Sequence, residues 1–222
     1  MNEYFDDFYH FGGFGPAFDA VAPSAETLNF YRHKLPPRLL EYWQEYGFCG
    51  WGEGAFWTVD PGDYRELLHA WLAGTPFENQ DDYHVIGRGA FGRLLIWGET
   101  SGLSLKINPC YGMIFPKASA AENLREQGSE LTIDLFYACL SKDSLDLDDA
   151  DDKPLFQRAL ARLGPLRAEE MYGFVPALAL GGAPKLANLQ KVNLFDHLLF
   201  LAELGEKQIM ADIVALSNAL HK

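Results

Sequence analysis

Cysteine is scarce in this sequence: 222 residues include only Cys49, Cys110 and Cys139, with no pair in CxxC spacing. An odd number without such spacing argues against a disulfide framework and against a zinc knuckle. No window of about 20 residues is continuously apolar, so we expect no membrane-spanning helix. The first residues, MNEYFDDFYHF, lack the basic start and the long apolar stretch of a signal peptide. We therefore expect a cytoplasmic protein that does not bind membranes.

Motifs of catalysis and metal binding are missing as well. The sequence contains no GxSxG, HExxH or P-loop motif, and no two histidines stand three or four residues apart. The segment GRGAFG, residues 87–92, matches GxGxxG, but the strand-like RLLIWGE follows it where the dinucleotide motif needs a helix. A glycine-rich hairpin turn fits this segment better. We expect no catalytic residues, no cofactor and no metal site, and therefore no enzyme.

Positive charge is the third deficit. The chain has 18 lysines and arginines against 31 acidic residues, which gives a net charge of -13. Such a chain repels phosphate backbones, and this disfavours direct binding of nucleic acid. It attracts a basic protein partner and accelerates the encounter. Solubility alone is the simpler explanation of acidity, so charge by itself does not select a function.

Helix and strand patterns in the first two thirds of the chain predict an α+β fold. An N-terminal set of helices is followed by an antiparallel β meander from about Tyr83 to Phe115, where short apolar runs alternate with glycine-rich turns. A further strand is expected at residues 55–60. The capping residues and apolar spacing predict helices over residues 2–10, 25–34, 36–46, 63–74, 118–127 and 129–142.

The sharpest change in composition is the acidic segment, residues 143–152, in which six of ten residues are aspartate. Such a run indicates a linker or a domain boundary. After it, the patterns predict helices over residues 154–164, 186–205 and 206–221, with a loop through GFVPALALGG. We therefore expect three parts: an α+β domain at residues 1–142, an acidic linker at 143–153, and a mainly helical subdomain at 154–222.

Two features are candidates for contact with a partner. The aspartates of the acidic segment lack the glycine and glutamate of a calcium loop, and a solvated linker is their simplest interpretation. Alternatively, they mimic phosphates and occupy arginine and lysine sites that hold DNA, or one of them reaches a nuclease's catalytic metal. A tryptophan between glycines, in CGWGEG, is expected in a loop, as a contact anchor or as a plug at the core edge. The candidate contact residues are Trp51, Glu53, Asp146, Asp148, Asp149, Asp151 and Asp152.

Several stretches resemble known bacterial families. Residues 164–182, GPLRAEEMYGFVPALALGG, and residues 186–205, LANLQKVNLFDHLLFLAELG, closely resemble the C-terminal domain of type VI secretion immunity proteins. Residues 14–64, from FGPAFDAVAP to GEGAFWTVDPGDY, resemble the GAD-like domain that usually precedes it. The looser pattern LPPRLLEYWQEYGF…GEGAFWTVDP is also similar to the SMI1/KNR4-like scaffold.

The resemblance implies an immunity protein that binds a cognate effector toxin and covers its active site. Relatives with this layout guard against DNase effectors, which implies a metal-dependent nuclease as the toxin. The family supplies no catalytic residues and no fixed set of contacts. Two other functions remain open: an SMI1/KNR4-like regulatory scaffold that binds an endogenous partner, and an enzyme that reverses or degrades a toxin product.

Overall fold

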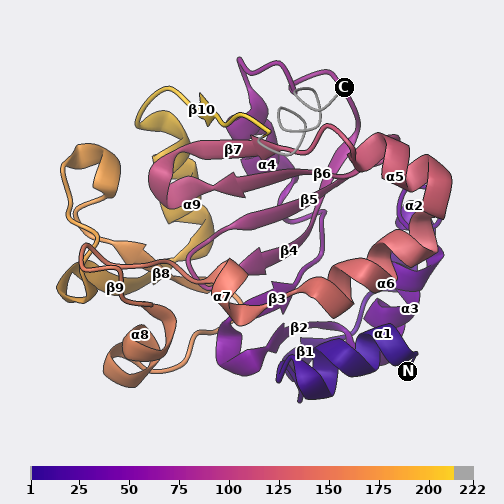
Figure 1. Ribbon diagram of the computed structural model, residues 1–222, viewed down its shortest axis with the longest axis horizontal. Helices are drawn as coiled ribbons and strands as arrows, with labels where there is room; N and C mark the ends of the chain where they lie inside the picture. Colours follow the sequence, from indigo (N-terminus) through magenta and orange to yellow (C-terminus); the bar gives the residue numbers. More distant parts are fainter. Residues whose placement is uncertain (1, 213–222) are drawn as a thin grey trace, which may run out of the picture.

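The computed structural model describes residues 2–212. Within these residues the largest element is an eight-stranded sheet in the order β1-β2-β3-β4-β5-β6-β7-β10 (Figure 1). Neighbours from β1 to β7 pair antiparallel, whereas β10 pairs parallel with β7. A separate antiparallel hairpin joins β8 to β9. The strands are β1 (Phe18–Val21), β2 (Phe48–Trp51), β3 (Phe56–Thr58), β4 (Tyr83–Gly89), β5 (Leu94–Gly98), β6 (Gly102–Asn108), β7 (Met113–Pro116), β8 (Glu170–Phe174), β9 (Leu189–Asn193) and β10 (Gln208–Ile209).

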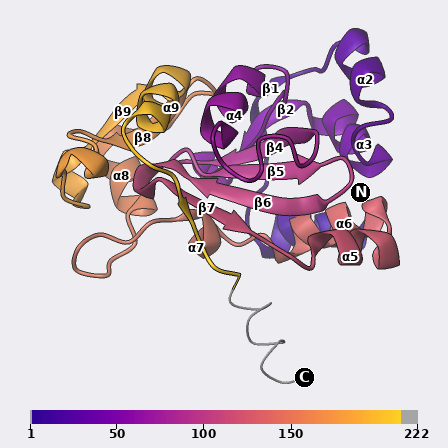
Figure 2. The same cartoon turned by 90° about the horizontal axis from the view of Figure 1, so that it is seen from above.

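Helices cover both faces of the large sheet. Figure 2 shows α4 and α9 over one face, and α5 and α6 over the other. Helices α1 and α3 pack against α6, which extends this second layer toward the N-terminus. The α-helices are α1 (Glu3–Asp6), α2 (Ala25–Tyr31), α3 (Pro37–Tyr46), α4 (Arg65–Leu72), α5 (Ala120–Gln127), α6 (Ser129–Cys139), α7 (Lys142–Leu145), α8 (Phe156–Leu163) and α9 (Leu194–Glu203).

Local signals explain where several of these elements begin and end. Ser24 caps α2, because its hydroxyl accepts a hydrogen bond from the Thr27 N–H at 2.9 Å. Pro37 begins α3, and Gly47 ends it with a φ of 79°, a conformation that glycine adopts without strain. Strands β4 to β7 form the expected meander. The α+β fold class is therefore confirmed, although the sequence patterns miss the short strands β1 and β2.

An aromatic cluster fills the core between α1, α6 and the strands β2 and β3. Trp51 lies 5.7 Å from Phe5 and 5.2 Å from Phe8 between ring centroids, both edge to face. Tyr137 of α6 packs 5.1 Å from Phe8 and 6.3 Å from Phe56. Tilted and edge-to-face pairs of this kind add to the free energy gained by burying the rings. The cluster joins the N-terminal helix to a helix more than 120 residues later in the chain.

Buried polar contacts join the same elements. The carboxylate of Asp134 in α6 accepts a hydrogen bond from Tyr42 Oη at 2.7 Å and from Asn2 Nδ2 at 2.8 Å. Its other neighbour is Arg38, with Nε 3.3 Å away. Asp134 is only 6% exposed, so its carboxylate has lost most of its contact with water. These partners replace the hydrogen bonds that water would have made. Helices α1, α3 and α6 are thereby fixed relative to one another.

Arg88 connects the meander to the segment before β8. Its side chain is fully buried, and its guanidinium carbon lies 4.8 Å from the centroid of the Trp57 ring. Nη2 donates hydrogen bonds to the carbonyl oxygens of Arg167, at 3.3 Å, and Ala168, at 2.8 Å. Burial lowers the pKa of Arg88, although an arginine keeps its charge under such conditions. A buried cation therefore binds the backbone of the C-terminal part directly.

The C-terminal part contains a hairpin that the sequence patterns do not reveal. The expectation of a single helix over residues 186–205 is wrong in its first half, since Leu189–Asn193 form β9 and the helix α9 starts at Leu194. Asn193 caps α9 by accepting a hydrogen bond from the Asp196 N–H at 3.1 Å. The partner strand β8 lies in the expected loop. Short apolar runs fit helix and strand equally well, and only the pairing partner decides between them.

The expected final helix, residues 206–221, is contradicted at its start, because Gln208–Ile209 form β10. Residues 213–221 of that prediction lie outside the part of the chain that the structure describes. Between residues 2 and 212, no helix has both the length and the apolar character needed to cross a membrane.

Candidate functional site

The acidic segment has a defined fold rather than an extended course. It begins in α7 and then turns back on itself, so that Asp148 and Pro154 form an isolated β-bridge. The N–H of Ala150 donates a hydrogen bond to the carbonyl oxygen of Pro184 at 2.8 Å, which attaches the segment to the loop between β8 and β9. Two of its aspartates bind neighbouring backbone groups, and the other four face solvent.

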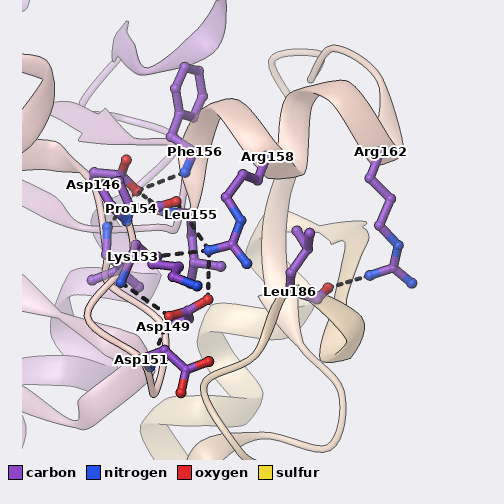
Figure 3. A network of polar contacts seen from close by, with 11 residues as sticks. Asp146, Asp149, Asp151, Lys153, Pro154, Leu155, Phe156, Arg158, Arg162 and Leu186 are labelled. Carbon is purple, nitrogen blue, oxygen red and sulfur yellow. Dashed lines mark hydrogen bonds and ion pairs between the residues drawn. The ribbon is translucent and has the colours of Figure 1, made fainter.

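Asp146 is one of the two inward-facing aspartates. Its Oδ1 accepts hydrogen bonds from the N–H groups of Leu147 at 2.7 Å, Leu155 at 3.2 Å and Phe156 at 2.9 Å (Figure 3). The last two donors belong to the start of α8, where backbone N–H groups lack partners within the helix. Burial raises the pKa of Asp146, and these N–H groups oppose the shift. Asp146 is therefore a capping residue of α8.

Asp149 is the second inward-facing aspartate. Its Oδ2 lies 2.6 Å from Arg158 Nη1, and its Oδ1 accepts hydrogen bonds from the N–H groups of Asp151 and Lys153 (Figure 3). The hydrogen bond from Arg158 lowers the pKa of the Asp149 carboxyl, and the two backbone donors act in the same direction. Asp149 thus holds the turn of the acidic segment against α8.

The remaining aspartates of the segment carry exposed carboxylates. Asp143, Asp148, Asp151 and Asp152 are exposed, and none of the four forms an ion pair with another residue in the described range 2–212. Asp152 also has a φ of 56°, a left-handed conformation that is uncommon for a residue other than glycine. Four carboxylates on one short segment create a local negative potential that is open to a partner.

Apolar and acidic side chains from other elements lie beside this segment. The turn Pro109–Tyr111 contacts the turn Leu178–Leu180, which belongs to the loop between β8 and β9 to which the acidic segment is attached. Burial raises the pKa of Tyr111, and Cys110 and Asp148 add to the shift. Leu180, in the loop that binds Ala150 through Pro184, is 59% exposed. Sequence patterns point to neither residue as a contact candidate, because a single exposed leucine or tyrosine carries no periodic signal.

Glu53 is brought to the same region by α8. Its Oε2 lies 3.4 Å from Nε2 of Gln157, the second residue of α8. Glu53 is exposed and has a φ of 62°, within a tight reversal between Gly52 and Gly54. Glu53 and the acidic segment therefore both contact α8. The exposed candidate contact residues are Glu53, Asp148, Asp151 and Asp152, whereas Asp146 and Asp149 bind neighbouring backbone groups.

Trp51 does not lie in an exposed loop, and that expectation is wrong. It is the last residue of β2, it is 1% exposed, and its Nε1 donates a hydrogen bond to Thr58 Oγ1 at 3.3 Å. The reversal suggested by the glycines occurs after Trp51, at Gly52 to Gly54. Its ring packs edge to face on Phe5 and Phe8 within the aromatic cluster, so the indole is not available as a surface anchor.

The chemistry available at this surface is charge and shape. Among residues 2–212, no group of three or more histidine, cysteine, aspartate or glutamate side chains is arranged to hold a metal ion. Exposed carboxylates can accept hydrogen bonds from arginine and lysine side chains of a partner. The surface formed by Asp143, Asp148, Asp151, Asp152, Glu53, Tyr111 and Leu180 is hereafter called the acidic surface.

Comparison with protein families places these parts in a known arrangement. Residues 8–111 match the family model of the GAD-like domain. Residues 130–205 match the family model of the T6SS immunity protein Tdi1, C-terminal domain, where T6SS denotes the type VI secretion system. The chain therefore carries a GAD-like domain followed by a Tdi1-type C-terminal domain, as the resemblance predicts. This architecture supports an immunity protein of the type VI secretion system.

The second match includes the acidic segment and α6. Since α6 packs on α1 and α3, the two matched regions share one core.

A solved structure shows the same fold. The crystal structure of Atu4351 from Agrobacterium tumefaciens aligns with 92% of this chain and 90% of its own, with a TM-score of 0.80 and 22% sequence identity. At this identity the likeness concerns the fold alone. A search of curated proteins gave no match.

Proposed function

We propose that this protein binds a cognate effector toxin, a metal-dependent DNase, and inhibits it by covering the active site with the acidic surface. The Tdi1-type C-terminal domain supports the assignment to toxin immunity, and the family suggests inhibition without catalysis. The single observation that carries the site is the group of exposed, unpaired carboxylates at Asp143, Asp148, Asp151 and Asp152.

The physical argument rests on what a DNase must present. A cleft that binds DNA carries lysine and arginine side chains that neutralise phosphates. Carboxylates on a short, folded segment are opposite in charge to those cations, and the net charge of -13 steers the two proteins together. Tyr111 and Leu180 add apolar area beside the charges. Charge then sets the association rate, and apolar burial slows dissociation.

The affinity required for immunity sets the size of the contact. Protection of a cell needs nanomolar binding, about -12 kcal/mol. Interfaces of that strength bury on the order of 1,600 Å² in total. The acidic surface is therefore the centre of a larger contact area, in which surrounding residues exclude water.

The first experiment asks whether the complex forms. The product of the neighbouring gene is tested as the toxin: it is produced together with this protein, and the pair is purified through a tag on that product. We expect a stable complex in which metal-dependent DNA cleavage is suppressed. A toxin that cleaves DNA equally well with and without a molar excess of this protein would refute the proposal.

The second experiment locates the contact by comparing two variants of equal net charge. One carries Asn in place of Asp143, Asp148, Asp151 and Asp152. The matched control carries Gln in place of four exposed glutamates on other elements, namely Glu26, Glu66, Glu122 and Glu203. We expect the Asp variant to associate at least tenfold more slowly at low salt and to show a flatter salt dependence, whereas the control stays near the wild-type rate. Equal rates for the two variants would remove the acidic surface from the mechanism.

A further inference from the structure

A groove lies next to α7, between the large sheet and the helices α5 and α6. Its main cavity has a volume of about 380 Å³ and is bordered by β5, β6, α5, α6 and the first residues of the acidic segment. A second cavity of about 380 Å³ continues it along β6 and β7, and the two have residues of β6 in common. Each volume falls in the range of small-ligand sites, roughly 300 to 1,000 Å³.

The walls of this groove are largely apolar. Leu95, Phe136 and Leu140 line the main cavity, and Phe115 lines its continuation. On the sheet, Lys106 is paired with Leu95 on one side and with Phe115 on the other, so these three side chains lie on one face. An apolar floor with a cation at its centre is therefore built into the register of β5, β6 and β7.

Three cations converge on the groove in a protein that is otherwise strongly acidic. Arg93, Lys106 and Lys117 line both cavities. Within residues 2–212 no carboxylate forms an ion pair with any of the three, although Asp146 attracts Arg93 weakly. Partial desolvation lowers the pKa of Lys106, and repulsion from Arg93 and Lys117 lowers it further.

Arg93 also has unused hydrogen-bonding capacity. Its Nη1 donates to the carbonyl oxygen of Ser144, while its Nε is buried without a hydrogen-bond partner. A buried donor without an acceptor destabilises a protein. A bound anion would lower that cost and would also reduce the repulsion among the three cations.

We propose that this groove binds a small amphipathic anion, with one carboxylate or phosphate group on an apolar chain or ring. The anionic group lies among Arg93, Lys106 and Lys117, and the apolar body lies against Leu95 and Phe136. The roof formed by α5 and α6 limits the occupant to a small molecule. This site is separate from the acidic surface, and its test does not require the toxin.

Cys139 provides a direct reporter, because it lines the main cavity and is exposed, whereas Cys49 and Cys110 are buried. The probes are octanoate and octanol, which share a chain but differ in charge. The rate of alkylation of Cys139 by N-ethylmaleimide, a neutral reagent, is followed by mass spectrometry of the full chain. We expect octanoate to slow alkylation at least fivefold at saturation, and octanol at the same concentration to have little effect. A Cys139→Ser variant should lose the rapidly modified site.

Charge variants then test the assigned cations. Lys106→Gln together with Lys117→Gln should weaken octanoate binding, measured by calorimetry, by roughly tenfold or more. The matched control is Lys153→Gln together with Lys185→Gln, two exposed lysines that line neither cavity, and it should bind octanoate as the wild type does. Thermal unfolding checks that each variant is folded, and both altered lysines are exposed, so little loss of stability is expected.

Three outcomes would overturn the site. The first is equal protection of Cys139 by octanoate and octanol, since charge would then play no part. The second is unchanged octanoate affinity in the double lysine variant. The third is the absence of binding below about 1 mM for both octanoate and the aromatic anion 1-anilinonaphthalene-8-sulfonate, which together cover chain-like and ring-like bodies at modest affinity.

Discussion

In the GAD-like part of the chain large apolar side chains meet one another, whereas in the C-terminal part many polar side chains bind the backbone. The five tryptophans of the sequence all lie before residue 98, and each is 2% exposed or less. After residue 142, side-chain to backbone hydrogen bonds recur at short intervals; they involve Asp146, Asp149, Arg162, Tyr172, Asn188 and Asn193.

The difference teaches how each part tolerates change. Aromatic packing depends on volume, and it fails when a ring is removed. Backbone capping depends on one acceptor at one place, and it fails when that atom is removed even if the volume is kept. Substitutions in the two parts should therefore differ in size and in kind, and the following experiments are ordered from the largest expected effect on stability to the smallest.

Trp51→Ala should give the largest loss, because it empties a site that contacts Phe5, Phe8 and Tyr46. We expect the free energy of unfolding, measured by urea titration, to fall by about 3 to 5 kcal/mol. Trp51→Phe keeps most of the ring and should lose clearly less. A loss below about 1 kcal/mol for the alanine variant would mean that the aromatic cluster does not dominate this part.

Arg88→Met tests the connection between the two parts. The carbonyl group of Ala168 would lose its Arg88 donor, whereas that of Arg167 keeps the Glu170 N–H, and the loss of a hydrogen bond to a charged group costs about 1.5 to 3 kcal/mol. We expect a total loss on the order of 3 kcal/mol, and amide exchange should become faster at residues 166–174 than in the meander. Uniform acceleration across the chain would show that Arg88 stabilises the whole core rather than the junction.

Asp146→Ala removes one acceptor from three N–H groups, two of which lie at the start of α8. We expect a loss of about 1 to 3 kcal/mol, with unfolding of α8 seen first by amide exchange. Asp146→Asn keeps an oxygen acceptor without the charge and should retain most of the stability. If Asn and Ala cost the same, the carboxylate charge rather than the acceptor stabilises the helix start.

Asp149 makes stability depend on pH. Arg158 lowers the pKa of this carboxyl in the folded protein, so the folded state favours its ionised form more than the unfolded chain does. This contribution is fully present above about pH 4, the ordinary aspartate pKa, and is lost as the pH falls through the lowered value. Asp149→Asn and Arg158→Met should each reduce the stability difference between pH 6 and pH 3, measured by urea titration. An unchanged difference in both variants would contradict the assignment.

The variant with Asn at Asp143, Asp148, Asp151 and Asp152 should have the smallest effect on folding. Exposed side chains without ion pairs contribute within about 0.5 kcal/mol each, and removing their mutual repulsion favours the folded state. We expect an unfolding midpoint close to that of the wild type even though toxin association slows. A marked loss of stability would assign these carboxylates to the fold rather than to binding.

Sequence patterns predict the first part well for a physical reason. Helix caps at Ser24 and Gly47 and the alternation of strands and turns in the meander are local signals, which act within a few residues. The family resemblance likewise depends on continuous stretches of sequence. These features specify the α+β class and the immunity architecture without knowledge of distant contacts.

Sequence patterns do not predict the conformation of the acidic segment or of the hairpin β8–β9. The contacts that shape them involve residues distant in the sequence, or depend on which way a side chain points. Composition shows six aspartates, but only the folded turn separates the capping Asp146 and Asp149 from the exposed four. A glycine-flanked tryptophan fits a loop or a strand end, and Trp51 is in the core because Phe5, Phe8 and Tyr46 from distant segments pack on it.

The sequence by itself determined the order of most elements, the net negative charge and the domain families. Tertiary structure alone decided which charges are buried, which face solvent, and which cations gather beside α5 and α6. The physical reason is that local propensity depends on neighbours along the chain, whereas burial and electrostatic environment depend on residues brought together by folding.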